Sequence, residues 1–575
     1  MNHIIHSDIA RGIKPAELVL KNAQIVNVFN QSIEIADIAI QDGIIVGIGD
    51  YSGTQEIDCS NQYVAPGFID GHVHIESSML TPSEFSKLVV PKGTTRVIAD
   101  PHEIANVKGV KGLGFMLRSS LDTPLHVHIM IPSCVPATAF ETAGASIDAE
   151  DIYNLHKREG ILGLGEVMDY PGVIHGNKAL LDKLSIMQDS IIDGHAPGVT
   201  NKDLNAYLLH HIKTDHECTT KAELDEKVSR GMYVHLREGS ATRNVKALVP
   251  GITEKTSHRL LFCTDDKHPM DIVNEGHINY NVNLATSLGV DPLVAIQMAT
   301  INIATCYQLS NVGAIAPGYV ADLIVFDDVK NIQPTKVFID GELVADHGTM
   351  LFETHKYDSI HVRDTVKFNM QDINLDLPLS SNRVKVMQLV ENNVTTSQVI
   401  RDVTVKNGLY FNNPDDDILK IAVVERHHYT KNVGVGLLEG YGLKDGAIAM
   451  TIAHDSHNLI VVGDNDKDML VAIKELRDHQ GGITIVHDGH VIDTLPLEIA
   501  GIMTNEDYEV VQEKLHHLEQ AALKLGVNTN VDDPFLTLAF MALPVIPDLK
   551  LTDKGLFDVV AFQPTTIEVN DDDVC

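Results

Sequence analysis

Between residues 68 and 300, short apolar segments alternate with segments of helical pattern, and this alternation constrains the fold more than any other feature. A strand buried on both faces of a parallel sheet reads as a continuous apolar run, and a helix usually follows it. The pattern predicts eight such strands, at residues 68–74, 94–99, 125–131, 161–167, 190–195, 213–216, 232–236 and 259–265. Eight βα units in about 230 residues match the size of a TIM (β/α)8 barrel.

Local signals fix some of the helices between these strands. The run Thr81-Pro82-Ser83-Glu84 predicts a capping box with proline at the first helical position. Thr220, with Glu223 three residues later, predicts the start of a helix over 220–230, and a further helix is expected over 202–212.

The segments that flank the barrel have a different pattern, that of β-strands without helices between them. Short alternating strands fill residues 15–65 and return after residue 311, so we assign both flanks to one small β-sandwich into which the barrel is inserted. An amphipathic helix at 506–525 marks further globular sequence. The expected class is α/β, with four segments: the sandwich halves at 1–66 and 311–370, the barrel at 67–310, and a C-terminal α+β domain at 371–575.

Composition excludes several classes of partner. The chain of 575 residues has 44 lysines and arginines against 79 aspartates and glutamates, a formal charge of −35. Nucleic acids and anionic membrane surfaces require concentrated basic surfaces, so neither is expected. No run of 18 apolar residues and no signal peptide is evident. The six cysteines are scattered, as in reduced proteins, and we expect a cytoplasmic protein.

Ligand-type side chains recur at the ends of the predicted barrel strands. His72 and His74 project to the same face because alternate residues of a strand do. A carboxylate stands in the apolar fourth strand, and similar residues follow strands five, six and eight, which completes the set His72, His74, Glu166, His195, His216 and Asp265. Each residue alone is more often an ordinary hydrogen-bonded side chain. Together, at the carboxyl-terminal ends where barrels place their active sites, they predict two divalent cations bridged by Glu166.

Three further groups are less specific. His102 and Glu103, after strand two, fit a site or a structural role equally well. The run His454-Asp455-Ser456-His457-Asn458 lies between two strand-like segments, which indicates either a lid over the active site, the favoured interpretation, or a hydrogen-bonded turn. Arg426-His427-His428 is expected at the surface.

Specific strings resemble those of a known family. A β-sandwich split around a metal-bearing barrel is similar to the amidohydrolase superfamily, and several runs look like bacterial adenine deaminases: 66–80 (PGFIDGHVHIESSML), 99–106 (ADPHEIAN), 163–170 (GLGEVMDY), 193–198 (DGHAPG), 234–241 (VHLREGSA), 263–266 (CTDD) and 453–461 (AHDSHNLIV). The resemblance covers nearly the whole chain. It implies hydrolytic deamination of adenine to hypoxanthine and ammonia, in purine salvage, by an assembly of two or more copies.

The resemblance also implies roles for individual residues. Asp265 would move the proton between water and the leaving amine, Glu166 would bridge the metals, and Arg237 and Glu238 would grip the purine edge, although Arg237 fits a plain ion pair equally well. His102, Glu103, His454, Asp455 and His457 are further candidates for substrate contacts. The ligand set has no thiolate, so manganese, iron or zinc would suit it, and the resemblance favours manganese or iron.

Two other interpretations remain open at this point. A cyclic-amide hydrolase of the same superfamily often bridges its metals with a modified lysine on strand four, where this chain has Glu166. A non-catalytic assembly relative usually lacks ligands, whereas this chain has the full set.

Overall fold

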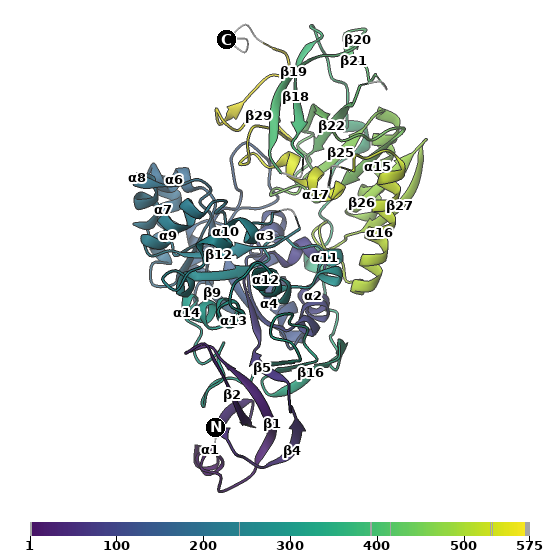
Figure 1. The fold of residues 1–575 in the computed structure, drawn as a ribbon. Coiled ribbons are helices and arrows are strands. Elements are labelled where there is room, and N and C mark those ends of the chain that lie inside the picture. Colours follow the sequence, from purple (N-terminus) through teal and green to yellow (C-terminus); the bar gives the residue numbers. More distant parts are fainter. Residues whose placement is uncertain are drawn as a thin grey trace.

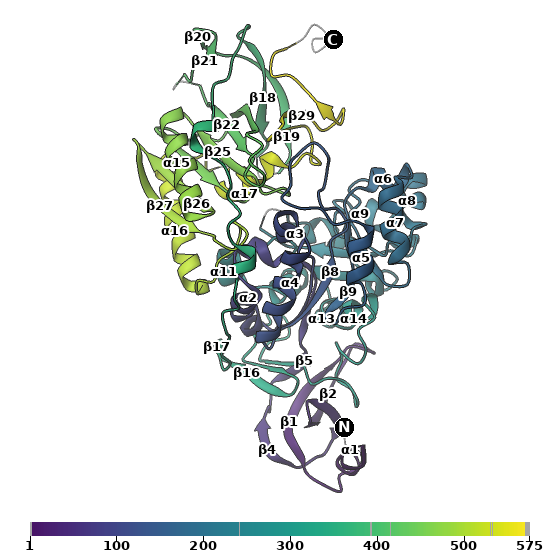
Figure 2. The same cartoon turned by 180° about the vertical axis from the view of Figure 1, so that it is seen from behind.

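The computed structural model describes residues 3–240, 242–391, 394–413, 416–529, 531 and 533–569. Figure 1 shows three parts along the long axis of the molecule: a sheet from the N-terminal strands at one end, a helix-wrapped barrel in the middle, and a C-terminal part at the other end. The view from behind in Figure 2 shows the same order. None of the helices in the described ranges is long and apolar enough to cross a bilayer.

The middle part is a barrel of eight parallel strands. They are β6 (Phe68–Val73), β7 (Thr94–Ala99), β8 (His126–Ile131), β9 (Ile161–Val167), β10 (Ile191–Gly194), β11 (Thr214–Asp215), β12 (Tyr233–Arg237) and β13 (Leu260–Cys263). Strands β6–β10 form one hydrogen-bonded group and β11–β13 another. A parallel bridge between Val73 and Asp265 joins β13 to β6, and Lys213 N–H donates to Ile192 O between β10 and β11. Each of the eight strands predicted from the sequence overlaps one of these, so the barrel prediction is confirmed.

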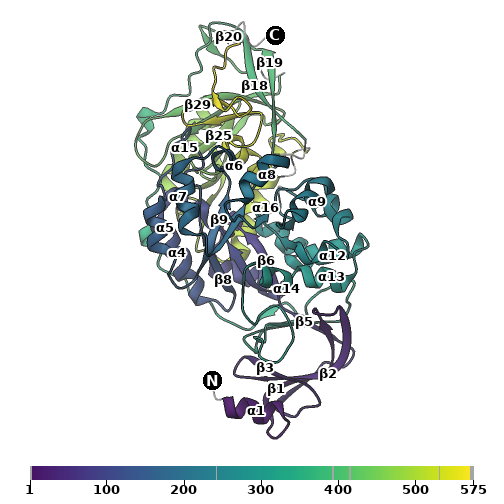
Figure 3. The same cartoon turned by 90° about the vertical axis from the view of Figure 1, so that its left-hand side faces the viewer.

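Helices surround the barrel strands (Figure 3). They include α2 (Pro82–Val89), α3 (His102–Lys108), α4 (Val110–Ser119), α5 (Ala149–Leu155), α6 (Tyr170–Ile174), α7 (Lys178–Ile186), α8 (Asn201–Leu208), α9 (Lys221–Ser229), α10 (Val245–Leu248), α11 (Pro269–Asn274), α12 (Ile278–Ser287), α13 (Pro292–Met298) and α14 (Ile301–Cys306).

The two predicted helix caps have different outcomes. Thr220 accepts a hydrogen bond from the N–H of Glu223 at the start of α9, as predicted. The capping box at Thr81 is wrong, although α2 does begin at Pro82. Thr81 bonds the Ser83 hydroxyl at 3.1 Å, and Lys87 holds the Glu84 carboxylate at 2.7 Å, so neither side chain reaches the backbone it was expected to cap.

The two flanks of the barrel meet in one nine-stranded sheet. It contains β1 (Ala16–Asn27), β2 (Ser32–Gln41), β3 (Ile44–Gly49), β4 (Gly53–Asp58) and β5 (Tyr63–Pro66), with β14 (Leu323–Phe326), β15 (Lys336–Ile339), β16 (Glu342–Asp346) and β17 (Thr349–Met350). Antiparallel β5 and β14 join the flanks, with Val64 opposite Val325. The hairpin between β2 and β3 turns at Asp42 and Gly43, both at positive φ as its tight turn requires.

The C-terminal part is built on an eight-stranded sheet in the order β19-β18-β23-β22-β25-β24-β26-β27. The strands are β18 (Arg383–Leu389), β19 (Thr396–Asp402), β22 (Ile418–Val424), β23 (Val433–Glu439), β24 (Gly446–Met450), β25 (Leu459–Gly463), β26 (Gly482–His487) and β27 (His490–Pro496). Helix α15 (Asp466–His479) packs on the face with Ala447 and Val461. Helix α16 (Tyr508–Lys524), predicted at 506–525, belongs to a different hydrophobic cluster, which includes Ile448 of β24.

This C-terminal part lies on the rim of the barrel. Thr504 N–H donates to Met79 O at 2.9 Å, Thr142 Oγ1 donates to Asp553 Oδ2 at 2.7 Å, and His268 Nδ1 lies 2.8 Å from Asp533 Oδ2. The chain before α2, the loop after β8 and the segment before α11 are therefore all tied to it. The rim is the carboxyl-terminal end of the barrel strands, where the predicted ligands are located.

Two further expectations concern the exposure of Arg426-His427-His428 and the state of the cysteines. Arg426 and His427 are buried and only His428 is exposed, so the surface placement of this run was wrong for the first two. Their burial follows from the packing of the C-terminal part on the barrel, which the local sequence does not reveal. Among the described residues the cysteines are free and buried, and Cys575 lies outside them.

Candidate metal centre and active site

The end of β6 places two imidazoles face to edge. His72 and His74 are buried, and their Nε2 atoms lie 3.2 Å apart. Asp265 N–H donates to His72 O, and His74 N–H donates to Asp265 O, so the backbone at the end of β13 fixes both residues. The His74 ring is oriented by a 2.8 Å contact between Nδ1 and Asp100 O, which leaves Nε2 pointing toward His72 and Asp265.

Glu166 lies between two groups of imidazoles. Its Oε1 is 3.8 Å from His72 Nε2 and 3.3 Å from His74 Nε2. Its Oε2 is 2.7 Å from His195 Nδ1 and 3.3 Å from His216 Nε2. Each carboxylate oxygen thus faces its own pair of nitrogen donors, which is the arrangement expected of a carboxylate that bridges two cations.

Close packing behind Glu166 explains its position. Glu166 N–H donates to Asp100 Oδ2 at 2.8 Å. A Cβ on the neighbouring Gly165 would lie 2.1 Å from the same oxygen, so only glycine allows Asp100 to approach β9 this closely. Gly165 therefore makes room for Asp100, which in turn holds the backbone of Glu166 in place.

Asp265 completes the predicted set. Its Oδ1 lies 3.0 Å from His74 Nε2 and 3.4 Å from His72 Nε2, while its Oδ2 lies 2.5 Å from Arg237 Nη1. Burial alone would raise the pKa of this carboxyl, but Arg237 and the two imidazoles hold it well below its usual range. Asp265 is consequently ionised at neutral pH, with one oxygen fixed by the arginine and the other directed at the cluster.

The donor set fits a bound cation. Among the described residues, His72, His74 and Glu166, then Glu166, His195 and His216, and then His72, His216 and Asp265, each offer ligand atoms within 4.8 Å of one another. Burial would lower the pKa of His195, but Glu217 and Glu166 raise it to about 9, so the cavity favours positive charge. Imidazole and carboxylate lone pairs that converge in a buried site favouring positive charge are suited to divalent metal ions.

Arg237 is already occupied by carboxylates. Its Nη1 lies 2.6 Å from Glu217 Oε1 as well as 2.5 Å from Asp265 Oδ2, so the structure places it in an ion-pair network beside the ligands. Glu238 points elsewhere: its Oε2 accepts from Val245 N–H at 3.4 Å. Burial raises the pKa of Glu238 to about 7, against the opposing charges of Arg243 and Lys267.

His102 and Glu103 begin α3 at the edge of the ligand cluster. His102 Nδ1 lies 3.5 Å from Glu166 Oε1, and its ring centre is 4.4 Å from that of His74. Glu103 accepts a 3.0 Å hydrogen bond from Ser77 and lies 3.4 Å from His454 Nδ1. Burial, then the neighbouring Asp266 and Glu76, raises the pKa of Glu103 well above its usual range, which favours the neutral carboxyl.

The run 454–458 is a buried turn between β24 and β25 that reaches the barrel. His454 contacts Glu103 as described, and Asp455 Oδ1 lies 3.9 Å from His102 Nε2. His457 is fully buried, its Nε2 has no hydrogen-bond partner within the described structure, and its carboxylate neighbour is Glu103. The run is a buried turn whose side chains contact Glu103 and His102 beside the predicted ligands, and its role as a lid over the active site stays a prediction.

Comparisons with known proteins agree with this geometry. Residues 63–344 match the amidohydrolase family, and residues 393–563 match the adenine deaminase C-terminal domain. The protein named adenine deaminase 2 of Carboxydothermus hydrogenoformans is 48% identical over 565 residues, which cover 98% of this chain and 99% of that protein. The adenine deaminase of Clostridium acetobutylicum is 48% identical over 559 residues, 96% of this chain and 98% of that protein. The chain belongs to the adenine deaminase family.

The two matched segments of this adenine deaminase family member meet at the metal centre. All six predicted ligands lie within the amidohydrolase segment, whereas His454, Asp455 and His457 belong to the C-terminal segment. The C-terminal segment therefore lies against His102 and Glu103, beside the cluster of predicted ligands.

Two residues near the centre, Glu217 and Asp266, were missed from the sequence. Glu217 lies 3.4 Å from His216 Nε2 and 3.7 Å from His195 Nδ1, and Asp266 accepts a 2.5 Å hydrogen bond from Ser77. Each of the two acids directly follows a predicted ligand, and strand alternation would direct it to the opposite face. Both lie beyond the strand ends, where alternation no longer applies, so adjacency to His216 and Asp265 was the available signal.

Proposed function

We propose that this chain hydrolyses adenine to hypoxanthine and ammonia, with two divalent cations held by His72, His74, Glu166, His195, His216 and Asp265. The supporting observation is the position of Glu166, whose two oxygens face separate pairs of imidazoles. Family membership, with relatives named as adenine deaminases over almost their whole length, supports the choice of substrate.

The cations would supply Lewis acidity, which lowers the pKa of water and polarises the substrate. Manganese or iron is the proposed metal, with zinc as the alternative. Imidazole and carboxylate donors suit these ions. Cys263, the thiol next to the centre, is buried with its pKa raised well above the ordinary value, so it stays a neutral thiol.

Asp265 is the proposed proton carrier. Water adds to carbon 6 of the purine as the π bond between carbon 6 and N1 opens, and one water proton passes to the Asp265 carboxylate. That proton then goes to the exocyclic nitrogen as the C–N bond breaks and ammonia leaves, and the second water proton ends on N1 of hypoxanthine. Arg237 keeps this carboxylate ionised and oriented before the reaction. The residue acts through Asp265 and is a positioning residue in this scheme.

The proposed substrate contacts come from both segments. A neutral Glu103 offers one donor and one acceptor, which complements the alternating acceptors and donors on a purine edge. His102, His454, Asp455 and His457 line the same face of the centre. Glu238, whose carboxylate faces Val245 and the neighbouring cations, has less support as a substrate contact than these residues.

The test uses the full-length enzyme purified with manganese supplied. Ammonia release and the ultraviolet change to hypoxanthine are followed with adenine, with adenosine in parallel, before and after treatment with a chelator and again after manganese is returned. We expect turnover of adenine that the chelator abolishes and manganese restores. A metal-loaded enzyme inactive on adenine would overturn the proposal and favour a cyclic-amide substrate. The cytoplasmic location and the homo-oligomer stay predictions.

A further inference from the structure

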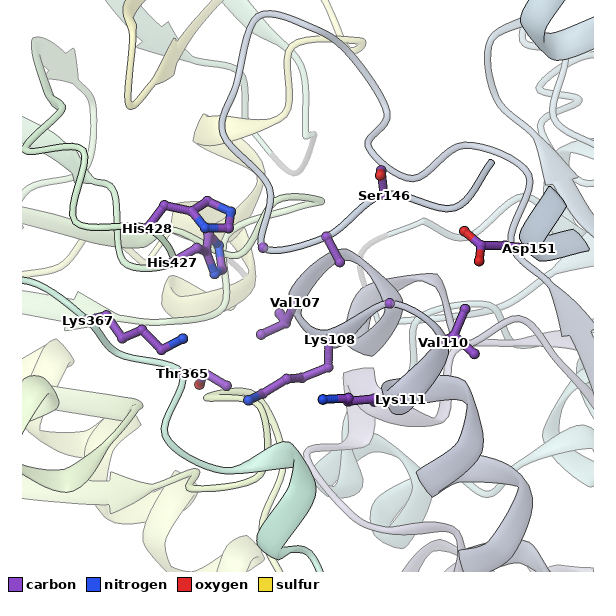
Figure 4. Close-up of a pocket in the computed structure, with 13 residues that line it drawn as sticks. Val107, Lys108, Val110, Lys111, Ser146, Asp151, Thr365, Lys367, His427 and His428 are labelled. Carbon is purple, nitrogen blue, oxygen red and sulfur yellow. The ribbon is translucent and has the colours of Figure 1, made fainter. Parts of the chain in front are cut away.

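A pocket that contains none of the predicted ligands lies where the barrel meets the C-terminal part (Figure 4). Its volume is about 370 Å³, within the range of small-molecule sites. The barrel contributes residues 107–111, at the junction of α3 and α4, and residues 144–146 of the loop before α5. Thr365, Lys367, His427 and His428 form the facing wall from the C-terminal part.

The pocket concentrates positive charge in a chain whose net charge is −35. Lys108, Lys111 and Lys367 line it, and Figure 4 shows their ammonium ends on the same side of the pocket. No carboxylate within the described ranges forms an ion pair with any of the three. Lysine side chains gathered without acidic partners repel one another, so an anion between them would be favoured.

The surrounding charges do not cancel this excess. Arg426, buried beside Thr365, donates only to the carbonyl oxygens of His457, Ala500 and Thr365 and to the Thr365 hydroxyl. Asp151 is the carboxylate among the lining residues, and it accepts the Asp148 N–H in the cap of α5. Burial and then Lys367 lower the pKa of Lys108, with Asp364 opposing them.

Backbone donors add to the side chains. Helix α4 has ten residues and begins in the pocket, where the N–H groups of Val110 and Lys111 have no acceptor within α4 itself. Its N-cap is Gly109, which has no side chain to cap them and sits at φ 55°, ψ −138°. The positive end of a helix dipole thus adds to the three ammonium groups.

We propose that this pocket binds the phosphate group of a small phosphorylated metabolite. Lys108 and Lys111 on the barrel and Lys367 on the C-terminal part would contact the same phosphate, so the bound ligand would also tie the two parts together. Lysine is a common phosphate binder, and charge-assisted hydrogen bonds to phosphate are among the stronger ones. The inference does not depend on the deamination reaction.

The first experiment measures binding to the metal-loaded full-length enzyme by calorimetry. The probes are inorganic phosphate, ribose 5-phosphate and uncharged ribose. We expect both phosphates to bind and to raise the melting temperature, and ribose to do neither. Tighter binding of ribose 5-phosphate would indicate an ester, and equal binding would indicate free phosphate. Failure of both phosphates to bind at millimolar concentration would overturn the proposal.

Variants then locate the site, because phosphate can also bind metal ions. The double variant Lys108→Gln/Lys367→Gln should weaken phosphate binding by about tenfold or more, since two charge-assisted contacts are lost. Lys202→Gln, which removes an exposed lysine from α8, is the matched control and should leave the affinity unchanged. Undiminished binding in the double variant would also overturn the proposal. Both lysines are partly exposed, and circular dichroism and metal content verify folding without relying on deamination.

Discussion

Glu166 is the residue on which both halves of the ligand cluster depend. Its oxygens face His72 and His74 on one side and His195 and His216 on the other, and its backbone is fixed by Asp100. Burial would raise the pKa of Glu166, but the histidines hold it well below its usual value. A charged carboxylate between two donor groups is the feature that allows two cations to share one site.

Replacing this charge should disable the centre. We expect Glu166→Gln to lower kcat/KM for adenine by about a hundredfold or more and to reduce the metal content, because a neutral amide cannot bridge two cations. Metal analysis and steady-state assays check this. Glu141→Gln is the control, since burial raises the pKa of Glu141 to about 8 and the group is largely neutral already at pH 7. Near-normal turnover in Glu166→Gln would contradict the two-metal assignment.

The convergence of the six predicted ligands was predictable because parallel strands end at one rim of a barrel. His72, His74, Glu166, His195, His216 and Asp265 required only the correct strands and their direction. Glu217 and Arg237 illustrate what the strand pattern does not predict. Their ion pair joins the end of β11 to the end of β12, and neither strand shows from its own sequence which charges will be opposite.

At the scale of elements, the turn 454–458 is held in place from behind by Arg426. This arginine follows β22, is fully buried and donates to the carbonyl of His457. Its other donors reach Thr365 and Ala500, so one guanidinium joins three segments of the C-terminal part. The local sequence suggested a surface residue because a buried arginine without a carboxylate partner is rare.

Removing that anchor should affect catalysis more than metal binding. We expect Arg426→Gln to lower the melting temperature and to lower kcat/KM for adenine about tenfold, while metal content is retained, because the turn that carries His454 and Asp455 loses its support. Arg426→Lys should recover part of the activity. Arg477→Gln on α15, a half-exposed arginine, is the control. Loss of metal together with activity would contradict a positioning role for Arg426.

At the scale of the whole molecule, the C-terminal part packs on the rim of the barrel where the predicted ligands lie. Periodicity in the sequence predicted the barrel strands and helix α16, but the domain boundaries at 66/67, 310/311 and 370/371 stay predictions. The docking of the C-terminal part depends on contacts between residues hundreds of positions apart, such as Thr142 with Asp553. Such pairs leave no periodic signal in the sequence.

His268 and Asp533 form an ionic contact across this boundary. They stand at the first turns of α11 and α17 (Pro534–Ala539), with His268 Nδ1 2.8 Å from Asp533 Oδ2, and both are largely buried. Burial lowers the pKa of His268, but Asp533 outweighs this effect and raises the pKa to about 9. The folded state therefore binds more protons than the unfolded state between the ordinary histidine pKa, about 6.5, and about 9.

Stability from this pair should be lost as pH rises through that window. We expect the difference in melting temperature between wild type and His268→Gln to be largest at pH 6 and to shrink toward zero above about pH 9, because the imidazolium that Asp533 stabilises is then deprotonated. Thermal unfolding of the metal-loaded enzyme across this range measures the difference. His479→Gln, an exposed histidine paired with Glu475 on α15, is the control and should show a small difference. If the His268→Gln difference stays constant from pH 6 to pH 10, the charged pair does not hold the C-terminal part on the barrel.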